Sequence, residues 1–230
     1  MRLAMDMNLL GSSASSLQQT KILERSNALK RKIDAWINVQ HLYMPEVAIL
    51  RTRENASIGS PVAVSDIKLF LPSYSHETLK CSPALLNCEW EFRYAQAGET
   101  LNTLRGFLLL RSHLYNSKAR YSHGVRLHTQ SMKILKTVET NIKQITKTYR
   151  LIRTSMEMLS SVLLKVSWEN IFRPLLDSDI AGLSSMDDTG SEGRKRLSWI
   201  WKVHSTGENA DNCTQAGQSF VMIQFSSNFD

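Results

Sequence analysis

Apolar residues recur at alternating three- and four-residue steps over much of the chain, which predicts long amphipathic helices. The clearest repeat lies within residues 125–166 and runs without a slip, as in the packing seam of a coiled coil. At 1.5 Å per residue such a helix is about 60 Å long, so it needs partners along its length. The predicted helix-packing seam consists of Leu135, Val138, Ile142, Ile145, Tyr149, Ile152, Met156, Leu159 and Leu163.

A second helix is predicted over residues 15–50, where a run of serines at residues 12–16 offers an N-cap. Pro45 interrupts its pattern, because a proline removes a backbone hydrogen bond and clashes one turn back. We therefore expect a break or kink there, with a short helical continuation from Val47 to Leu50. The predicted stripe is Ile22, Leu29, Ile33, Trp36, Gln40 and Tyr43, with Trp36 as a core anchor.

A third helix is predicted over residues 83–116, with Pro83 at its first position, where a missing N–H is tolerated. Its stripe is Trp90, Tyr94, Ala97, Leu101, Leu104 and Leu108, with Trp90 as a core anchor. Three such helices predict a mainly α protein, arranged as an extended antiparallel three-helix bundle or coiled coil.

The remaining segments have no helical period. Prolines and polar residues interrupt residues 52–82, which predicts an irregular loop that is either locally packed or disordered. Within it, Ile67–Leu71 fits either a short strand or an anchor packed on the helices. Residues 177–193 are rich in Asp, Ser and Gly and predict an acidic loop within a helical region spanning residues 15–203. The ends, residues 1–14 and 204–230, are expected to be disordered, and the second could be an unrelated tail.

The net charge of +7, from 28 Lys plus Arg against 21 Asp plus Glu, is concentrated in one stretch. Eleven bases face only Glu139 between residues 105 and 153, a local balance of 11 − 1 = +10. The candidate phosphate-contacting residues are Arg105, Arg111, Lys118, Arg120, Arg126, Lys133, Lys136, Lys143, Lys147, Arg150 and Arg153. Two interpretations stay open: an unspecific contact with DNA or another polyanion, and the solvated flank of a coiled coil.

Nucleotide-binding and nucleophile motifs such as GxxxxGK[ST], GxGxxG and GxSxG do not occur, so we expect no catalytic activity and no cofactor. His123 and His128 are five residues apart, which does not place two ligands on one helix face. Three cysteines without a CxxC spacing argue against a zinc site or a disulfide framework. The aspartates at 177–188 lack an EF-hand spacing, so no metal or small-molecule ligand is expected.

Apolar runs are too short to span a membrane, the densest being Phe107–Leu110. Asp6 and Asn8 stand where a secretion signal would be apolar, so we expect an intracellular protein without membrane contact. Trp199 and Trp201 are two residues apart, and they either dock on the helices, remain as part of a truncated interface, or stack on nucleic-acid bases.

Several phrases together resemble the helical region that follows the catalytic core in fungal KDZ (Kyakuja-Dileera-Zisupton) transposases. The first two are ALKRKIDAW with QHLYMP, at residues 28–36 and 40–45, and EWEFRYAQA with LLRSHLY, at residues 89–97 and 109–115. The others are KVSWE with RPL, at residues 165–169 and 173–175, and SEGR with LSWIWK, at residues 191–194 and 197–202. The resemblance covers roughly residues 25–203.

The resemblance implies a DNA transposon whose metal-dependent core carries acidic catalytic residues, usually after a cysteine cluster. No carboxylate of this chain matches that catalytic set, and its three cysteines do not make the cluster. The expected function is therefore a non-catalytic helical module, a remnant or accessory part of such a transposase, nuclear if it functions there. Its expected partners are DNA, contacted unspecifically, and either a second copy or another helical protein. A structural coiled-coil interaction module and a non-functional gene fragment remain the alternatives.

Overall fold

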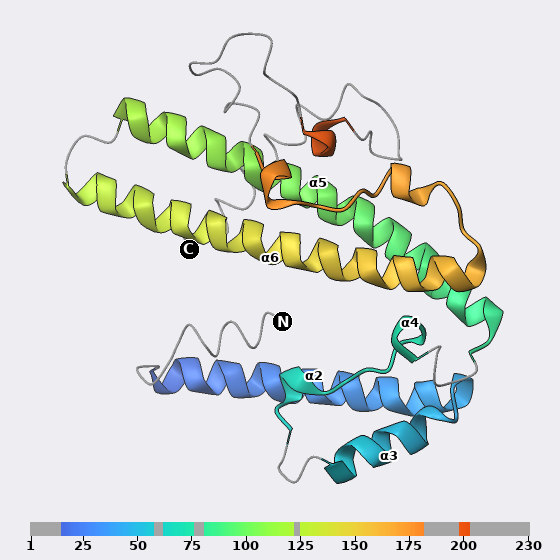
Figure 1. The fold of residues 1–230 in the computed structure, drawn as a ribbon. Helices are drawn as coiled ribbons and strands as arrows, with labels where there is room; N and C mark the ends of the chain where they lie inside the picture. Colours follow the sequence, from blue (N-terminus) through green and yellow to red (C-terminus); the bar gives the residue numbers. More distant parts are fainter. Residues whose placement is uncertain (1–14, 58–61, 76–80, 122–124, 182–197, 203–230) are drawn as a thin grey trace. The chain divides into compact units, whose positions relative to one another are not determined.

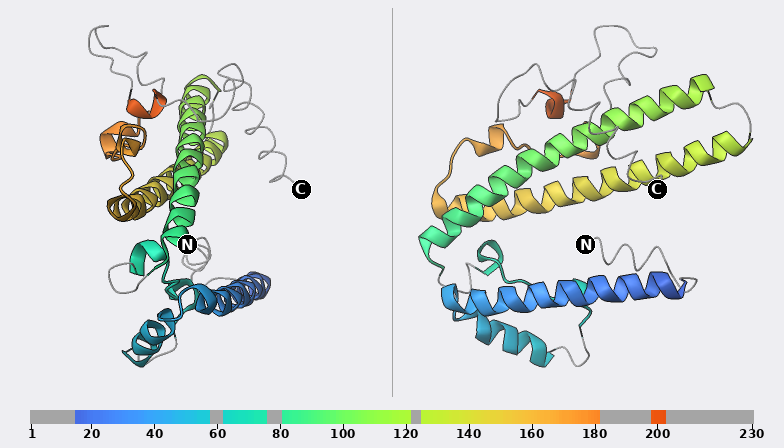
Figure 2. Two further views of the ribbon diagram at one scale, coloured as in Figure 1. Left: turned by 90° about the vertical axis from the view of Figure 1, so that its right-hand side faces the viewer. Right: turned by 180° about the vertical axis from the view of Figure 1, so that it is seen from behind.

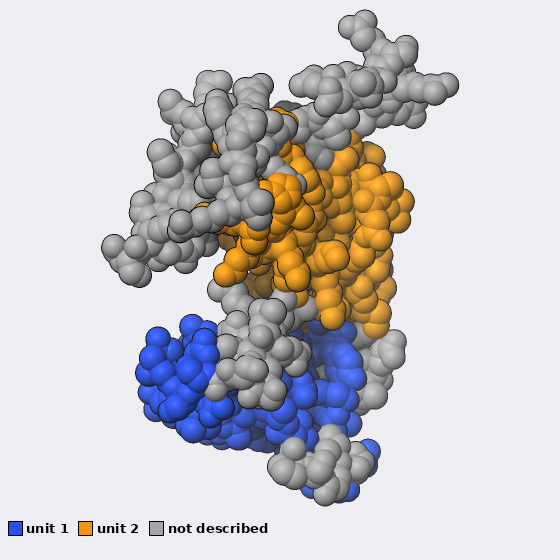
Figure 3. All heavy atoms as spheres, turned by 90° about the vertical axis from the view of Figure 1, so that its left-hand side faces the viewer, with its two compact units in different colours: residues 1–85 blue, residues 86–230 orange. Residues whose placement is uncertain are grey.

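The computed structural model describes residues 15–57, 62–75, 81–121, 125–181 and 198–202, and helices are the regular secondary structure in these ranges (Figure 1). The chain divides into two compact units, residues 1–85 and 86–230, which we describe separately (Figure 3). The sequence did not predict this boundary. The expectations for the two chain ends and for residues 182–193 of the acidic loop lie outside the described residues.

The first unit contains α2 (Ser16–Tyr43) and α3 (Val47–Ser57). Ser15 caps α2 as the serine run predicts: its hydroxyl accepts from the Gln18 amide at 3.4 Å, and its own amide donates to the Gln18 side chain at 2.9 Å. The break expected at Pro45 is confirmed. The helix resumes at Val47 but runs on to Ser57 rather than ending near Leu50.

The segment after α3 contains the short helices η2 (Val64–Asp66) and α4 (Pro72–Ser75). Between them, Ile67–Leu71 is irregular and belongs to no strand, so the anchor interpretation is right and the strand is wrong. Phe70 is buried with Met44 and Val47, the core cluster of this unit. We call residues 67–71 the short strap; it lies against the α2–α3 pair.

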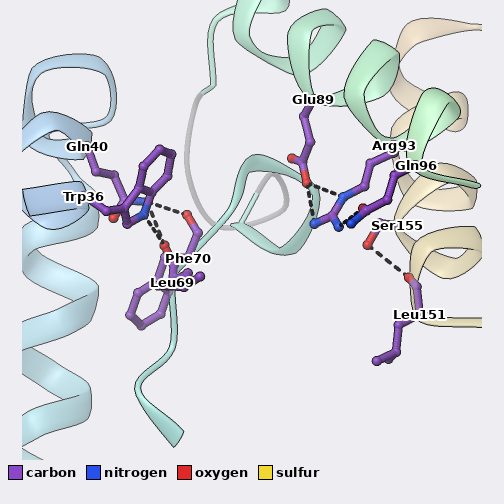
Figure 4. Close-up of polar contacts among 9 residues, drawn as sticks. All are labelled: Trp36, Gln40, Leu69, Phe70, Glu89, Arg93, Gln96, Leu151 and Ser155. Carbon is purple, nitrogen blue, oxygen red and sulfur yellow. Dashed lines mark hydrogen bonds and ion pairs between the residues drawn. The ribbon is translucent and has the colours of Figure 1, made fainter. Parts of the chain in front are cut away.

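Side chains of α2 and α3 hold the short strap by its backbone carbonyls, and Figure 4 shows the contacts made by Trp36 and Gln40. The Gln40 amide nitrogen donates to Leu69 O at 2.9 Å and to Phe70 O at 2.7 Å. Arg51 donates to Lys68 O at 3.1 Å and to the Gln40 side-chain oxygen at 3.0 Å, with its guanidinium 5.0 Å from the Phe70 ring centroid. Burial lowers the pKa of Arg51 from its ordinary value. A partly buried polar network therefore attaches the short strap to α2 and α3.

The prediction that Trp36 is a core anchor is wrong, since its side chain is 38% exposed and Tyr43, on the same stripe, is 67% exposed. Only Ile33 and Gln40 are buried along the 28 residues of α2. Among the described residues of its unit, α2 contacts mainly the short helix η2, the short strap and α3, which is too little chain to cover a helix of 28 residues. Trp36 is instead attached at its edge, where the indole nitrogen donates to Leu69 O at 3.4 Å.

The second unit is built on α5 (Pro83–Tyr121) and α6 (Val125–Leu163), two antiparallel helices of 39 residues each (Figures 1 and 2). Pro83 begins α5 as predicted. The expected end near residue 116 is wrong, because the residues that follow include no Gly or Pro and continue the helix to Tyr121. α6 ends at Leu163, three residues before its predicted end.

After α6 the chain turns back along the helix pair, in a segment that we call the long strap (residues 164–181, orange in Figure 1). It contains the short helices η3 (Trp168–Asn170) and η4 (Asp177–Asp179), and η7 (Trp199–Trp201) also lies in this unit. Helical structure thus agrees with the predicted class, whereas a single three-helix bundle is not observed among the described residues. No described helix combines the length and the apolarity that crossing a bilayer demands.

Candidate nucleic-acid interface

One side of α6 is its packing face. Of the predicted seam, Ile145 and Leu163 are partly exposed. The remaining positions are buried: Leu135, Val138, Ile142, Tyr149, Ile152, Met156 and Leu159. Thr146 is buried on the same side, a polar position that the apolar pattern could not indicate. A row of large buried side chains therefore fixes which side of α6 faces solvent.

The corresponding face of α5 is buried at nearly every predicted position. Tyr94 alone is partly exposed. The buried positions are Trp90, Ala97, Leu101, Leu104 and Leu108, of which Ala97, Leu104 and Leu108 have no exposed surface. An ion pair with 3.6 Å between Arg111 of α5 and Glu139 of α6 joins the two helices.

Four arginines of the basic stretch donate to backbone carbonyls of the returning chain. Two of them bind its later part, which is η7 and the end of the long strap. Arg105 donates to Ile200 O at 2.7 Å, and Arg111 donates to Ile180 O at 3.1 Å. A planar guanidinium with five donors suits this task, because it satisfies a buried carbonyl and keeps donors for a second acceptor.

The other two arginines act on the middle of the long strap. Arg150 donates to Leu175 O at 3.0 Å and pairs with Asp177 at 2.6 Å. Arg153 donates to Phe172 O at 3.1 Å and also pairs with Glu157. The Arg153 guanidinium lies 5.4 Å from the centroid of a Trp168 ring as well. These arginines therefore have acceptors within the chain, a use that the charge count could not distinguish from phosphate binding.

Four lysines of the same stretch lie on the solvent side of α6. Lys133, Lys136, Lys143 and Lys147 are all exposed. They are separated by steps of 3, 7 and 4 residues, which places them on one face of a helix. The first and last lie 14 residues apart, which is about 21 Å at 1.5 Å per residue. We call these four residues the lysine face.

Acidic residues do not neutralise this face. The helix contains only two acids, Glu139 and Glu157, and each pairs with an arginine. Glu139 lies one turn from Lys136 and Lys143, but its carboxylate pairs with Arg111. Over the described ranges, none of the four lysines forms an ion pair, so their charge is presented to solvent.

The structure thus divides the eleven candidate residues into two groups of four with different surroundings. For the remaining three, Lys118 and Arg120 fall within α5 and Arg126 falls within α6, but their side chains lie outside the described residues. The aspartates at 187 and 188 and His123 also lie outside them. Where side chains are described, no group of three or more His, Cys, Asp or Glu residues converges to hold a metal ion.

The tryptophans near residue 200 dock on the second unit. Ile200 is completely buried, and the Trp199 ring contacts Tyr149 with 6.3 Å between centroids. The Trp201 indole nitrogen donates to Ala181 O at 3.2 Å. Of the interpretations of this cluster, docking on the helices is therefore the one that the structure supports.

Comparison with known proteins yields no family model, no curated protein and no solved structure that matches this chain.

Proposed function

We propose that this chain is a non-catalytic helical module that contacts duplex nucleic acid unspecifically through the lysine face of α6. The observation that carries the proposal is the separation of the bases. Arg105 donates to η7, and Arg111, Arg150 and Arg153 donate to the long strap. Lys133, Lys136, Lys143 and Lys147 instead form an exposed row without acidic partners among the described residues. Lysine side chains along a rod neutralise phosphates and release counterions, which favours binding without base recognition.

The dimensions fit a duplex. DNA carries one phosphate per about 3.4 Å of axis on each strand, so a face of about 21 Å spans roughly six phosphates of one strand. Four lysines on that length can each meet a phosphate. If all four do so, the slope of log K against log salt is about −3.6, and affinity falls about 150-fold between 50 and 200 mM salt.

Binding of the full chain to a random-sequence duplex tests this proposal. Replacing the four lysines by Gln changes the net charge from +7 to +3, since 7 − 4 = 3. The matched control removes the same charge from α2, at the exposed Lys21, Arg25, Lys30 and Lys32. We expect the first variant to lose most of its affinity and salt dependence and the control to keep both.

Two results contradict the proposal. Equal losses in both variants would mean that net charge alone attracts the duplex. No retention of the wild-type chain at low salt would favour the alternative of a structural coiled-coil module whose lysines are only solvated.

The proposal also includes an origin for the chain: it is an accessory or remnant part of a KDZ-type transposase. A nuclear location follows from that origin. The origin is supported by the ordered phrases at residues 28–45, 89–115, 165–175 and 191–202. The genomic sequence on both sides of the reading frame tests it. An adjoining transposase core would support this origin, and intact unrelated genes on both sides would contradict it.

A further inference from the structure

The long strap binds α5 and α6 as a peptide ligand would. Its apolar anchors Trp168, Phe172 and Leu175 are 3%, 2% and 4% exposed. The Trp168 ring meets Trp90 edge-on with 5.8 Å between centroids, and the Phe172 ring meets Tyr94 edge-on at 4.9 Å. These contacts place the strap's side chains against helix residues far away in sequence.

Its backbone is held in the same way, by side chains of the helices. Tyr149 donates its hydroxyl to Arg173 O at 2.9 Å, beside the three carbonyls held by Arg111, Arg150 and Arg153. Apart from Trp201, which donates to Ala181 O, the side-chain donors that hold the strap's carbonyls lie on α5 or α6. A strap from a second copy of the chain would meet the same donors and the same rings.

The connection between α6 and the strap is short and strained. Leu164 has φ 53° and Ser167 has φ 69°, the left-handed region that glycine normally occupies. The Lys165 amide donates to Ser160 O at 3.1 Å, the bond of a left-handed helix cap, but the cap residue here is leucine. No Gly or Pro occurs from Ser160 to Ser167, so the sequence contains no signal that ends the helix.

We infer that two copies of this chain exchange their long straps. In the exchanged form α6 continues as a helix through residues 164–167. Leu164 and Ser167 then adopt helical φ angles, and the backbone strain at both residues is removed. Four more helical residues extend the helix by about 6 Å and carry Trp168 beyond its own Trp90, towards the same site on a second copy. Short strained hinges of this kind favour exchange of identical elements between protomers. The inference does not depend on the proposed contact with DNA.

Light scattering on the size-separated full chain, after equilibration at several concentrations, tests the hinge. We expect a dimer whose population rises with concentration. Glycine adopts left-handed φ without strain, so Leu164→Gly should stabilise the closed monomer and weaken dimerisation at least about 25-fold, roughly fivefold for each of the two hinges. Leu164→Ala is the matched control, because it removes the same exposed side chain and keeps the strain; it should remain dimeric.

Cross-linking tests the exchange itself. One copy carries Tyr94→Cys and the other Phe172→Cys, both in a background with Cys81, Cys88 and Cys213 replaced by Ser. After the copies are mixed, a short bismaleimide should join them, because exchange places residue 172 of one beside residue 94 of the other. A wild-type chain that stays monomeric at all concentrations overturns the inference, and so does a dimer insensitive to Leu164→Gly. A dimer that gives no cross-link between the two copies overturns it as well.

Discussion

Both units fix an irregular segment on a pair of helices by donating side-chain hydrogen bonds to its carbonyls, but their apolar cores differ in size. In the first unit the buried cluster is Met44, Val47 and Phe70, and α2 buries only Ile33 and Gln40 along its length. In the second unit both long helices are buried along a continuous face. The comparison suggests that the first unit depends on a polar network, whereas the second depends on apolar packing and uses its arginines to position the long strap.

The largest expected effect comes from the apolar face of the second unit. Leu108 has no exposed surface, so Leu108→Ala removes buried methyl groups and leaves a cavity; we expect a loss of about 2–5 kcal/mol in the free energy of unfolding. The neighbouring Leu109 is 40% exposed, and Leu109→Ala should change the free energy of unfolding by about 0.5 kcal/mol or less. Denaturant unfolding followed by circular dichroism measures both. Equal losses would contradict the assignment of the buried face.

A smaller effect is expected from the polar network of the first unit. Gln40→Ala removes both bonds to the short strap and leaves Arg51 without its side-chain acceptor, at a cost of about 1–3 kcal/mol. Hydrogen exchange should show faster opening in α2 and α3, with unchanged protection in α6. The exposed Asn38→Ala is the control and should leave the exchange rates unchanged. A Gln40→Ala protein with wild-type exchange in α2 would mean that the network does not fix this unit.

A pH-dependent effect separates Tyr149 from ordinary tyrosines. Burial raises its pKa above the ordinary value, and the nearby positive charge of Arg153 lowers it by less. The unfolded chain therefore loses this proton near pH 10, whereas the folded chain retains it. Above that pH the unfolded state is favoured, so stability should fall by about 1.4 kcal/mol per pH unit.

The matched variant is Tyr149→Phe, which keeps the ring and removes the titrating hydroxyl together with its bond to Arg173 O. It should be less stable at pH 7 but show a weaker decline between pH 10 and 11. Unfolding free energies measured across this interval check the difference. Parallel curves for the two proteins would contradict the buried position of the hydroxyl.

The smallest effect is expected at a single arginine. Arg153→Lys keeps the charge but loses the planar donor to Phe172 O and the contact with the Trp168 ring, a loss of about 1 kcal/mol. Lys147→Arg, a change of the same kind on the lysine face, should be neutral. Thermal unfolding compares the two. A neutral Arg153→Lys would mean that the strap does not depend on this guanidinium.

The periodic pattern predicted the long helices and their buried sides because a continuous apolar face needs only local spacing. It failed at Trp36, since burial there depends on how far a distant segment reaches along α2. It also could not separate the arginines from the lysines. Arg150 and Lys147 have the same charge and lie one turn apart, and only the path of the long strap gives the first an acceptor and leaves the second in solvent.

The most direct test of this separation is acetylation of the native chain with and without a saturating duplex at low salt, followed by mass spectrometry. We predict that Lys133, Lys136, Lys143 and Lys147 are modified rapidly in the free chain and become protected together by the duplex. Lys21 and Lys32 of α2, which are also exposed, should be modified at the same rate in both samples. Equal protection of both sets, or of neither, would contradict the account.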